Sequence, residues 1–288
     1  MGGPPNLGSA LEFVRTMGLG RDLALLKLVH GQELRDEELD ALTAAQNPDG
    51  GFKVAELGPP SVVGRTAEMV IYLTALGGGD LGAVQAAADF LIERQRPDGS
   101  WGEAESLAAL NPPPHFKPGS ADADGWETAA CVVALSGLGL PLDYRHPVEY
   151  LRDLRERPHG HRPLRLEGLL LYAAFRRIEG TDSPSAKTLR AEVDSVPPKD
   201  LEVFELNWGT YAFALAGADA RDPLLQAFGQ ALAGKQKPDG GFGSGPESSP
   251  YETALALGAL AMSGQISLPP RAPARAHDPD PANSDHGI

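Results

Sequence analysis

Cysteine is almost absent from this 288-residue sequence, which contains a single one, Cys131. One thiol cannot form an internal disulfide, and it cannot supply the several thiolates of a zinc site. Cys131 lies in the apolar run 129–133, where a free cysteine is more often a small core residue than a nucleophile. We therefore expect neither a disulfide nor a multi-thiolate metal site. Separately, we expect no resident metal or other cofactor.

Basic residues and long apolar runs are also scarce. The 25 Lys and Arg stand against 39 Asp and Glu, for a net charge of −14. An acidic surface of this kind disfavours nucleic acid, which needs a basic footprint, and it disfavours anionic lipid. No apolar run approaches the ~20 residues that span a bilayer, and the first residues carry no signal-peptide pattern. We expect a cytoplasmic protein that binds no nucleic acid and does not bind anionic membranes strongly.

What the sequence does contain is a repeated segment of the form Gln-x-Pro-Asp-Gly-Gly/Ser-Phe/Trp, at 46–52, 95–101 and 236–242. The first two copies begin 49 residues apart, and the third begins 141 residues later, close to three such periods. Pro-Asp-Gly ends a helix in a tight turn, because proline presets φ and glycine accepts a positive φ. We expect the aromatic residue to fasten one helical hairpin to the next, and degenerate copies near Arg155 and 194–198.

A second motif follows each turn and opens a helix with few charges. Its copies are Arg65-Thr66-Ala67-Glu68, Trp126-Glu127-Thr128-Ala129 and Tyr251-Glu252-Thr253-Ala254, with a variant at 208–212. Helices that are apolar on most faces are buried, whereas the helices that end in the Pro-Asp-Gly turns are amphipathic. This alternation predicts outer helices at roughly 9–17, 34–46, 82–95, 146–156, 184–194 and 223–236, and inner helices at roughly 21–31, 62–77, 126–139, 164–178, 207–217 and 250–263.

Six such hairpins predict an all-α fold, an (α/α)6 toroid. An open solenoid of the same hairpins would expose the apolar faces of its end repeats, and no polar capping repeat is evident. We therefore expect one toroidal domain over residues 1–264. The remaining segment, 265–288, is rich in Pro, Ala and Asp and is expected to be a flexible tail, because it has too little apolar surface to fold.

The motifs resemble those of one superfamily. The segment 95–101, preceded by Phe90-Leu91, resembles the QW motif of squalene-hopene and oxidosqualene cyclases. The segment 236–243 looks more like the corresponding turn of protein prenyltransferase β subunits. The resemblance covers about residues 8–264 and implies the terpene cyclase and prenyltransferase superfamily. Alignment with the prenyltransferases puts Trp208, Thr210 and Glu252 at the zinc-ligand positions, and one carboxylate of three does not make a zinc site.

Class II terpene cyclases start their reaction with the middle Asp of an Asp-x-Asp-Asp that precedes Thr-Ala. By this resemblance the candidate acid cluster is Asp122, Asp124 and Glu127, although Trp126 stands at the donor's position. A carboxyl group that protonates an alkene must be kept neutral, for example by a second carboxylate. The same acids are also explained by an N-cap at Asp122 or Asp124 and a first-turn Glu127, and the sequence leaves both interpretations open.

The resemblance also implies an apolar cavity inside the inner helices, and the remaining candidates line it. Aromatic faces stabilise carbocations, and the lining and auxiliary candidates at the heads of inner helices are Trp126, Trp208, Tyr211, Tyr251, Glu68 and Glu252. Basic residues at the mouth would hold a diphosphate, and the candidates are Arg65, Arg157, Arg162 and Arg165. The insertion 108–123 is placed to cover the cavity. Core packing and solvated loops are the alternative roles of these residues.

Together these features predict an isoprenoid-handling enzyme that resembles a single-domain class II cyclase and protonates a terminal alkene or epoxide without a metal in the chemical step. Its expected partner is a small apolar isoprenoid substrate, and either a homodimer or a complex with a partner subunit is compatible with the sequence. The alternatives are a non-catalytic toroid that binds a lipid or peptide or serves as a scaffold, and a prenyltransferase β-subunit-like protein without the zinc site.

Overall fold

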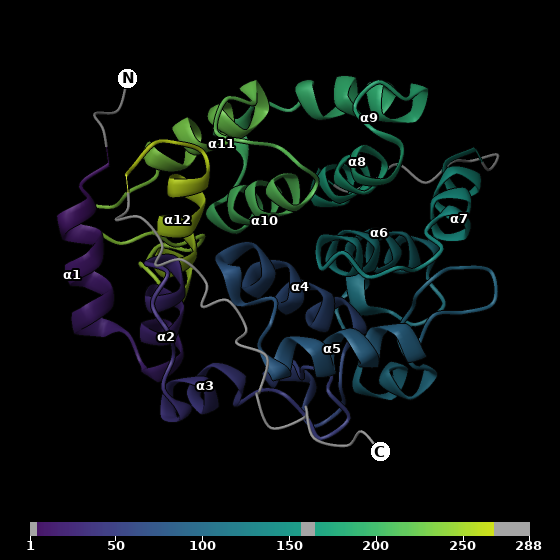
Figure 1. The fold of residues 1–288 in the computed structure, drawn as a ribbon, viewed down its shortest axis with the longest axis horizontal. Coiled ribbons are helices and arrows are strands. Elements are labelled where there is room, and N and C mark those ends of the chain that lie inside the picture. Colours follow the sequence, from purple (N-terminus) through teal and green to yellow (C-terminus); the bar gives the residue numbers. More distant parts are fainter. Residues whose placement is uncertain (1–4, 157–164, 268–288) are drawn as a thin grey trace, which may run out of the picture.

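The computed structural model describes residues 5–156 and 165–267, and this part of the chain is all-helical, as the sequence predicts. Its α-helices are α1 (Leu7–Met17), α2 (Gly20–Val29), α3 (Asp36–Thr43), α4 (Val63–Leu73), α5 (Gly82–Glu93), α6 (Ala121–Gly137), α7 (Arg145–Glu156), α8 (Arg165–Glu179), α9 (Pro184–Asp194), α10 (Val203–Leu215), α11 (Pro223–Ala233) and α12 (Pro250–Met262) (Figure 1). A π-turn, η2 (Thr74–Gly78), extends α4, and the short 3-10 helices are η1 (Ala55–Leu57), η3 (Glu105–Leu110), η4 (Pro114–Phe116) and η5 (Pro198–Asp200). None of the described helices is both long and apolar enough to cross a bilayer.

Two inner helices begin earlier than the sequence predicts. Helix α6 starts at Ala121 rather than near 126, and its N-cap position is held by Ser120. The interpretation of Asp122 or Asp124 as the N-cap is therefore wrong, because both residues lie inside the first turn. Helix α10 starts at Val203 rather than near 207, and the Glu205 carboxylate accepts a 2.7 Å hydrogen bond from the backbone N–H of Glu202. In both cases the helix dipole favours acids in the first turn, so the helix extends past the motif.

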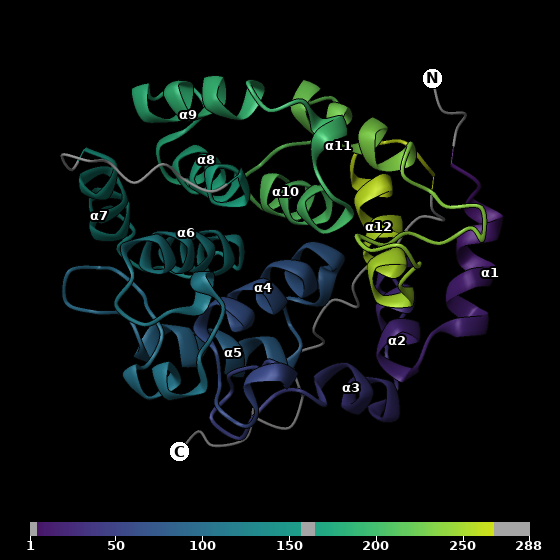
Figure 2. The same ribbon diagram turned by 180° about the vertical axis from the view of Figure 1, so that it is seen from behind.

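The even-numbered helices are the more buried ones, and they contact one another in order. Helix α4 packs on α6, α6 on α8, α8 on α10, α10 on α12 and α12 on α2, and α2 contacts the π-turn that extends α4. Each odd-numbered helix packs against an even-numbered one: α3 on α2, α5 on α4, α7 on α6, α9 on α8, α11 on α10 and α1 on α12 (Figures 1 and 2). Helix α4 also contacts α10, which is distant from it in the sequence.

Each Pro-Asp-Gly turn is fastened to an inner helix by the same hydrogen bond. The threonine of the second motif accepts a bond from the backbone N–H of the aromatic residue that ends the turn. The three bonds run from Phe52 to Thr66 (2.8 Å), from Trp101 to Thr128 (3.0 Å) and from Phe242 to Thr253 (2.8 Å). All three aromatic side chains are buried in the core. The predicted fastening role of the aromatic residue is confirmed, and the threonine is its partner.

The glycine of each turn contacts the next outer helix. Gly50, Gly99 and Gly240 have φ values of 85°, 85° and 88°, a left-handed conformation that favours glycine. A Cβ atom on Gly50 would come within 2.2 Å of the Ala86 carbonyl oxygen in α5. A Cβ on Gly240 would come within 2.7 Å of the backbone carbonyl carbon of Ser9 in α1. Only glycine allows these close approaches, and the last turn makes one to the first helix.

The glutamine of the turn makes a matching bond. The Gln46 side chain donates to the Ala83 carbonyl oxygen in α5 at 2.8 Å. The Gln236 side chain donates to the Asn6 carbonyl oxygen at 2.9 Å and accepts a bond from the Asn6 N–H at 2.6 Å. Asn6 caps α1. The contacts that join the first turn to its neighbouring hairpin therefore also join the last turn to the first helix.

Substitution of Gly240 by alanine tests this contact between the two ends of the chain. Gly217 is the matched control, because it has a similar positive φ of 84° but no heavy atom would lie within 4 Å of its Cβ. Gly217→Ala should cost only backbone strain, about 1–2 kcal/mol. Gly240→Ala should cost about 1–3 kcal/mol more, because the new methyl group overlaps α1. Urea unfolding measures both losses, and equal losses would contradict a tight contact at Ser9.

The segment between α5 and α6 has a small hydrophobic cluster of its own. Leu107 and Phe116 pack with two residues that precede α4, Leu57 and Val62, in a cluster separate from the main core. Phe116 reaches the head of α4, where a Cβ on Gly64 would lie 2.8 Å from its ring. This segment therefore covers the heads of α4 and α6 while it is packed on fewer residues than the rest of the fold.

Candidate functional site

Glu127 lies near the head of α6 and is fully buried, with 0% of its surface exposed. Its position is set by the next residue, Thr128, whose side chain accepts the N–H bond of Trp101. Neither carboxyl oxygen of Glu127 has a hydrogen-bond donor in the described part of the chain. A buried carboxylate without donors is strongly destabilised, so this environment favours the neutral acid.

The partner of Glu127 is Glu103, which the sequence analysis did not identify. Glu103 follows Trp101 by two residues and is 4% exposed. Its two oxygens accept 3.0 Å hydrogen bonds from the backbone N–H groups of Val63 and Gly64, the first two residues of α4. A helix N-terminus stabilises negative charge, so Glu103 has the environment of an ionised carboxylate. The two carboxyl groups are in hydrogen-bonding contact.

The electrostatics of this carboxyl pair, Glu103–Glu127, place a proton on one member. Burial is the main cause that raises the pKa of Glu127 well above its usual value, and the negative charges of Glu103 and Asp124 raise it further. Burial also raises the pKa of Glu103, but the two backbone donors at the head of α4 oppose that effect. Because, of the two carboxyl groups, Glu103 alone has backbone donors among the described residues, the proton of the pair belongs on Glu127.

The three predicted acids are in different environments. Asp124 forms a 2.9 Å salt bridge with Arg96 through one oxygen, and its other oxygen is buried with no hydrogen-bond partner in the part of the chain that the structure describes. Asp122 is exposed on the first turn of α6. Asp124 is close enough for its charge to act on Glu127. The structure thus brings Asp124 and Glu127 together with Glu103, while Asp122 lies at the surface.

An aromatic cluster packs between α4, α6 and α10. The ring centroids of Trp126 and Trp208 are 5.1 Å apart, those of Trp208 and Tyr72 are 5.6 Å apart, and those of Tyr72 and Tyr211 are 5.0 Å apart. His115 of the covering segment continues the series, 6.3 Å from Trp126. Three predicted lining residues therefore lie together. Tyr72 was missed because it is one apolar residue among many in its helix.

The fourth predicted aromatic residue, Tyr251, lies close to two arginines. The guanidinium of Arg21 lies 4.1 Å from the centre of the Tyr251 ring, and that of Arg65 lies 5.9 Å away. Arg65 also forms an ion pair with Glu68, so this diphosphate candidate and this auxiliary carboxylate are partners. Among the other diphosphate candidates, Arg157 and Arg162 lie outside the described residues, and Arg165 begins α8 without a described side chain.

The last predicted carboxylate, Glu252, binds the segment that follows the last turn to the head of α12. Its two oxygens accept hydrogen bonds from the backbone N–H of Ser244 at 2.8 Å and from the Ser244 hydroxyl at 2.7 Å. Glu252 precedes Thr253 just as Glu127 precedes Thr128, and Ser244 follows its turn aromatic by two residues just as Glu103 does. Aligning the repeats at this offset is the sequence signal that could have identified Glu103.

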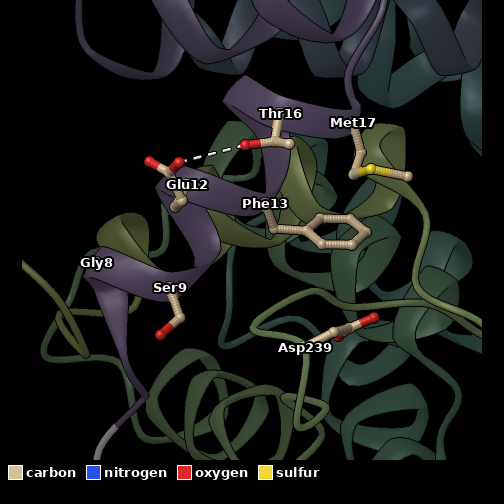
Figure 3. Close-up of a pocket in the computed structure, with 7 residues that line it drawn as sticks. All are labelled: Gly8, Ser9, Glu12, Phe13, Thr16, Met17 and Asp239. Atoms are coloured by element: carbon tan, nitrogen blue, oxygen red, sulfur yellow. Dashed lines mark hydrogen bonds between the residues drawn. The ribbon is translucent and has the colours of Figure 1, made fainter.

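Two pockets in the described part lie away from the carboxyl pair. A groove of about 500 Å³ runs beside α1 and is lined by Gly8, Ser9, Glu12, Phe13, Thr16, Met17 and Asp239 (Figure 3). A second, of about 330 Å³, is lined by Arg152, Arg155, Glu156, Phe175, Pro184, Ser185, Thr188 and Leu189. Neither contains a predicted site residue. Within 5–156 and 165–267, no three His, Cys, Asp or Glu side chains are grouped so as to hold a metal ion.

Comparison with known proteins gives little to build on. No family model matches the chain, and no curated protein matches it. A solved structure of a protein from Actinoplanes is similar to this chain with a TM-score of 0.49 and 19% identity, covering 85% of this chain and 90% of that one. Similarity at this level identifies neither a family nor an activity.

Proposed function

We propose that the chain is an (α/α)6 toroid that handles an isoprenoid, with Glu127 as the proton donor of a class II-type cyclisation. Two observations support the closed ring. The even-numbered helices contact one another in order as far as the α12–α2 pair. The bonds of a Pro-Asp-Gly turn to the next outer helix also occur between Gln236 and Asn6, at opposite ends of the chain.

The observation that carries the proposed activity is the carboxyl pair. Proton-initiated cyclisation needs a carboxylic acid that stays neutral inside the protein, and burial beside a second carboxylate provides this. Glu127 is buried with no hydrogen-bond donor among the described residues, and Glu103 accepts two backbone N–H bonds at the head of α4, which favour its charged form. The neighbouring residue Trp126 connects this acid to the aromatic cluster with Trp208 and Tyr72.

In the proposed reaction the Glu127 O–H bond breaks and its proton forms a C–H bond with a terminal alkene, or an O–H bond with an epoxide whose C–O bond then breaks. The cation produced on the substrate is attacked by an internal double bond, and it is finally quenched by loss of a proton or by addition of water. The aromatic faces of Trp126, Trp208 and Tyr72 would stabilise the cation. Glu127 regains a proton from solvent between turnovers.

Access to Glu127 requires movement of the segment between α5 and α6. That segment places Phe116 against Gly64 and His115 beside Trp126, and it is packed on its own small cluster. Segments with few buried contacts open at lower free-energy cost than a main core. A diphosphate on the substrate would be held by Arg65 with Arg157, Arg162 and Arg165. The proposed protein is cytoplasmic, and it acts either as a homodimer or with a partner subunit.

Glutamine in place of Glu127 is the direct test of activity. Glu127→Gln keeps the size of the side chain but removes its acidic proton, so turnover should fall by about 10²–10⁴-fold. Glu205→Gln is the control, because Glu205 is a buried acid at the head of another inner helix, where it caps α10. Purified protein is incubated with farnesyl diphosphate, geranylgeranyl diphosphate, squalene and an epoxide of squalene, and products are identified by mass spectrometry. Full turnover by Glu127→Gln would rule out this donor.

A second candidate function, a non-catalytic binding toroid or scaffold, is favoured by the packing of the aromatic cluster. Trp208 and Tyr211 of α10 lie against Tyr72 of α4 and are buried, so side chains occupy the space between these helices. A scaffold of this kind would show no product in the same incubation. Any retained lipid would then be identified from the denatured protein by mass spectrometry.

A further inference from the structure

Each Pro-Asp-Gly turn meets the inner helix that follows it at a joint, and two of these joints have the same residue spacing but different chemistry. In the last repeat, Glu252 near the head of α12 accepts two hydrogen bonds from Ser244. In the repeat that contains Trp101, Glu127 stands at the position of Glu252, and Glu103 stands at the position of Ser244. The last repeat can therefore be compared directly with this one, because it has the same joint with a serine that donates hydrogen bonds to the glutamate.

Replacing serine with glutamate changes the bonding of the joint. Ser244 donates both its N–H and its hydroxyl, so Glu252 is satisfied as an anion. Glu103 has no hydroxyl to donate, and its carboxylate accepts the N–H groups at the head of α4 instead. Two acceptor groups then meet in the interior, where an unpaired charge is costly. One shared proton removes this conflict, because it makes Glu127 a donor to Glu103.

The nearby cations do not neutralise the pair. Arg96 is bound to Asp124 at 2.9 Å, and Arg94 reaches Asp49 at 3.3 Å. Both arginines act on the carboxyl pair only through their charge.

The other titratable groups that face the pair do not offer it a cation either. On α6, Asp124 adds a further negative charge that favours the protonated form of Glu127. The Cys131 thiol, one turn further along, is fully buried, and burial raises its pKa well above the usual value. Its proton therefore stays on sulfur. Among the described residues, no cationic side chain is bonded to either carboxyl group of the pair, so a shared proton is what can join them.

We propose that Glu103 is a positioning residue that keeps one proton on Glu127. The joint of this repeat, which is purely structural in the last repeat, thereby holds a buried and protonated carboxyl group. The catalytic consequence rests on the function proposed above, but the stored proton does not, because it can be measured without any substrate. Glu103 acts through Glu127 and through its own hydrogen bonds to α4.

Infrared spectroscopy of the substrate-free protein tests this directly, because a protonated carboxyl group has a carbonyl stretch distinct from that of a carboxylate. The wild type should show this band at a pH where ordinary carboxyl groups are ionised. Glu127→Gln should remove the band, and Glu205→Gln should retain it. Glu103→Gln and Glu103→Ser should both move its disappearance to lower pH, because each removes a negative charge and supplies a donor. In Glu103→Asp, which keeps the negative charge, the band should disappear at a pH close to that of the wild type.

Two substitutions, Glu103→Gln and Glu103→Ser, are used because a folding defect in one of them would not be expected in the other. Glu103→Ser reproduces the Ser244 joint but removes the acceptors at α4, whereas Glu103→Gln keeps an acceptor oxygen for α4. The proposal is overturned if the wild type lacks the band, or if both variants lose it at the same pH as the wild type, which would assign the proton to burial alone. A band that shifts in a protein without cyclase activity supports the stored proton and counts against the proposed function only.

Discussion

Replacement of Trp101 by alanine is expected to lower the free energy of unfolding by about 3–5 kcal/mol. Trp101 has 0% of its surface exposed, and its indole N–H donates to the Leu91 carbonyl oxygen at 2.7 Å. Its backbone N–H is bonded to Thr128, so its side chain lies in the joint that connects α5 to α6. Truncation leaves both a cavity and an unsatisfied carbonyl group. Urea unfolding followed by circular dichroism measures the loss.

Trp101→Phe is the matched control for this prediction. Phenylalanine occupies the same position in the other two turns, as Phe52 and Phe242. The variant keeps an aromatic ring in the joint but removes the donor to Leu91, which should cost about 1–3 kcal/mol. If the alanine variant were no less stable than the phenylalanine variant, the aromatic residue would not be the fastener of the repeat.

Raising the pH through the neutral range is expected to destabilise the protein through Glu127. Burial raises the pKa of this group well above the usual 4.5 in the folded state. Above that usual value the unfolded chain has released this proton while the native state still holds it. The stability contributed by the proton is therefore complete below pH ~4.5 and is lost as the pH rises toward the folded pKa. The slope for this one proton is at most about 1.4 kcal/mol per pH unit.

The measurement is made between about pH 5 and 8. In this range the unfolded chain also releases the protons of His30 and His115, whose folded pKa values burial lowers, and this raises stability with pH in the wild type and in a Glu127 variant alike. At higher pH the buried Cys131 and Tyr72, whose pKa values burial also raises, add losses of their own. At lower pH, hydrogen-bonded carboxylates such as Asp98 and Asp239, whose pKa values are lowered in the folded state, lose their stabilising contribution because the unfolded chain takes up protons first.

Glu127→Gln is the control for the pH dependence, because glutamine does not titrate. Its stability should fall less steeply than that of the wild type between pH 5 and 8, and urea unfolding at several pH values gives both slopes. Identical slopes in the two proteins would show that Glu127 does not retain a proton in the native state.

Local chemistry made the helices and turns predictable. Pro-Asp-Gly at 48–50, 97–99 and 238–240 ends a helix wherever it occurs, and the threonine motif marks the helix that follows. The boundaries were less accurate where first-turn acids extend a helix, as at Asp122 and Glu205. A motif marks the point where a helix enters the core, whereas the first turn depends on capping.

The candidate site was only partly predictable for a related reason. Glu127 was found from its place before Thr128, but the sequence could not separate it from Asp122 and Asp124. Their different burial depends on which face of α6 meets α4, and this is a property of packing. Glu103 lies in a loop without periodicity, so its contacts with the head of α4 could not be read from the chain.

The sequence by itself determined an all-helical protein with repeated hairpins and a particular fastening turn, because these depend on residues close together in the chain. Only the tertiary structure decided that Glu127 lies against Glu103 with no donor side chain among the described residues, while Glu252 at the equivalent position accepts two bonds from Ser244. The protonation of a carboxyl group depends on every charge and donor around it, and segments distant in the sequence supply them.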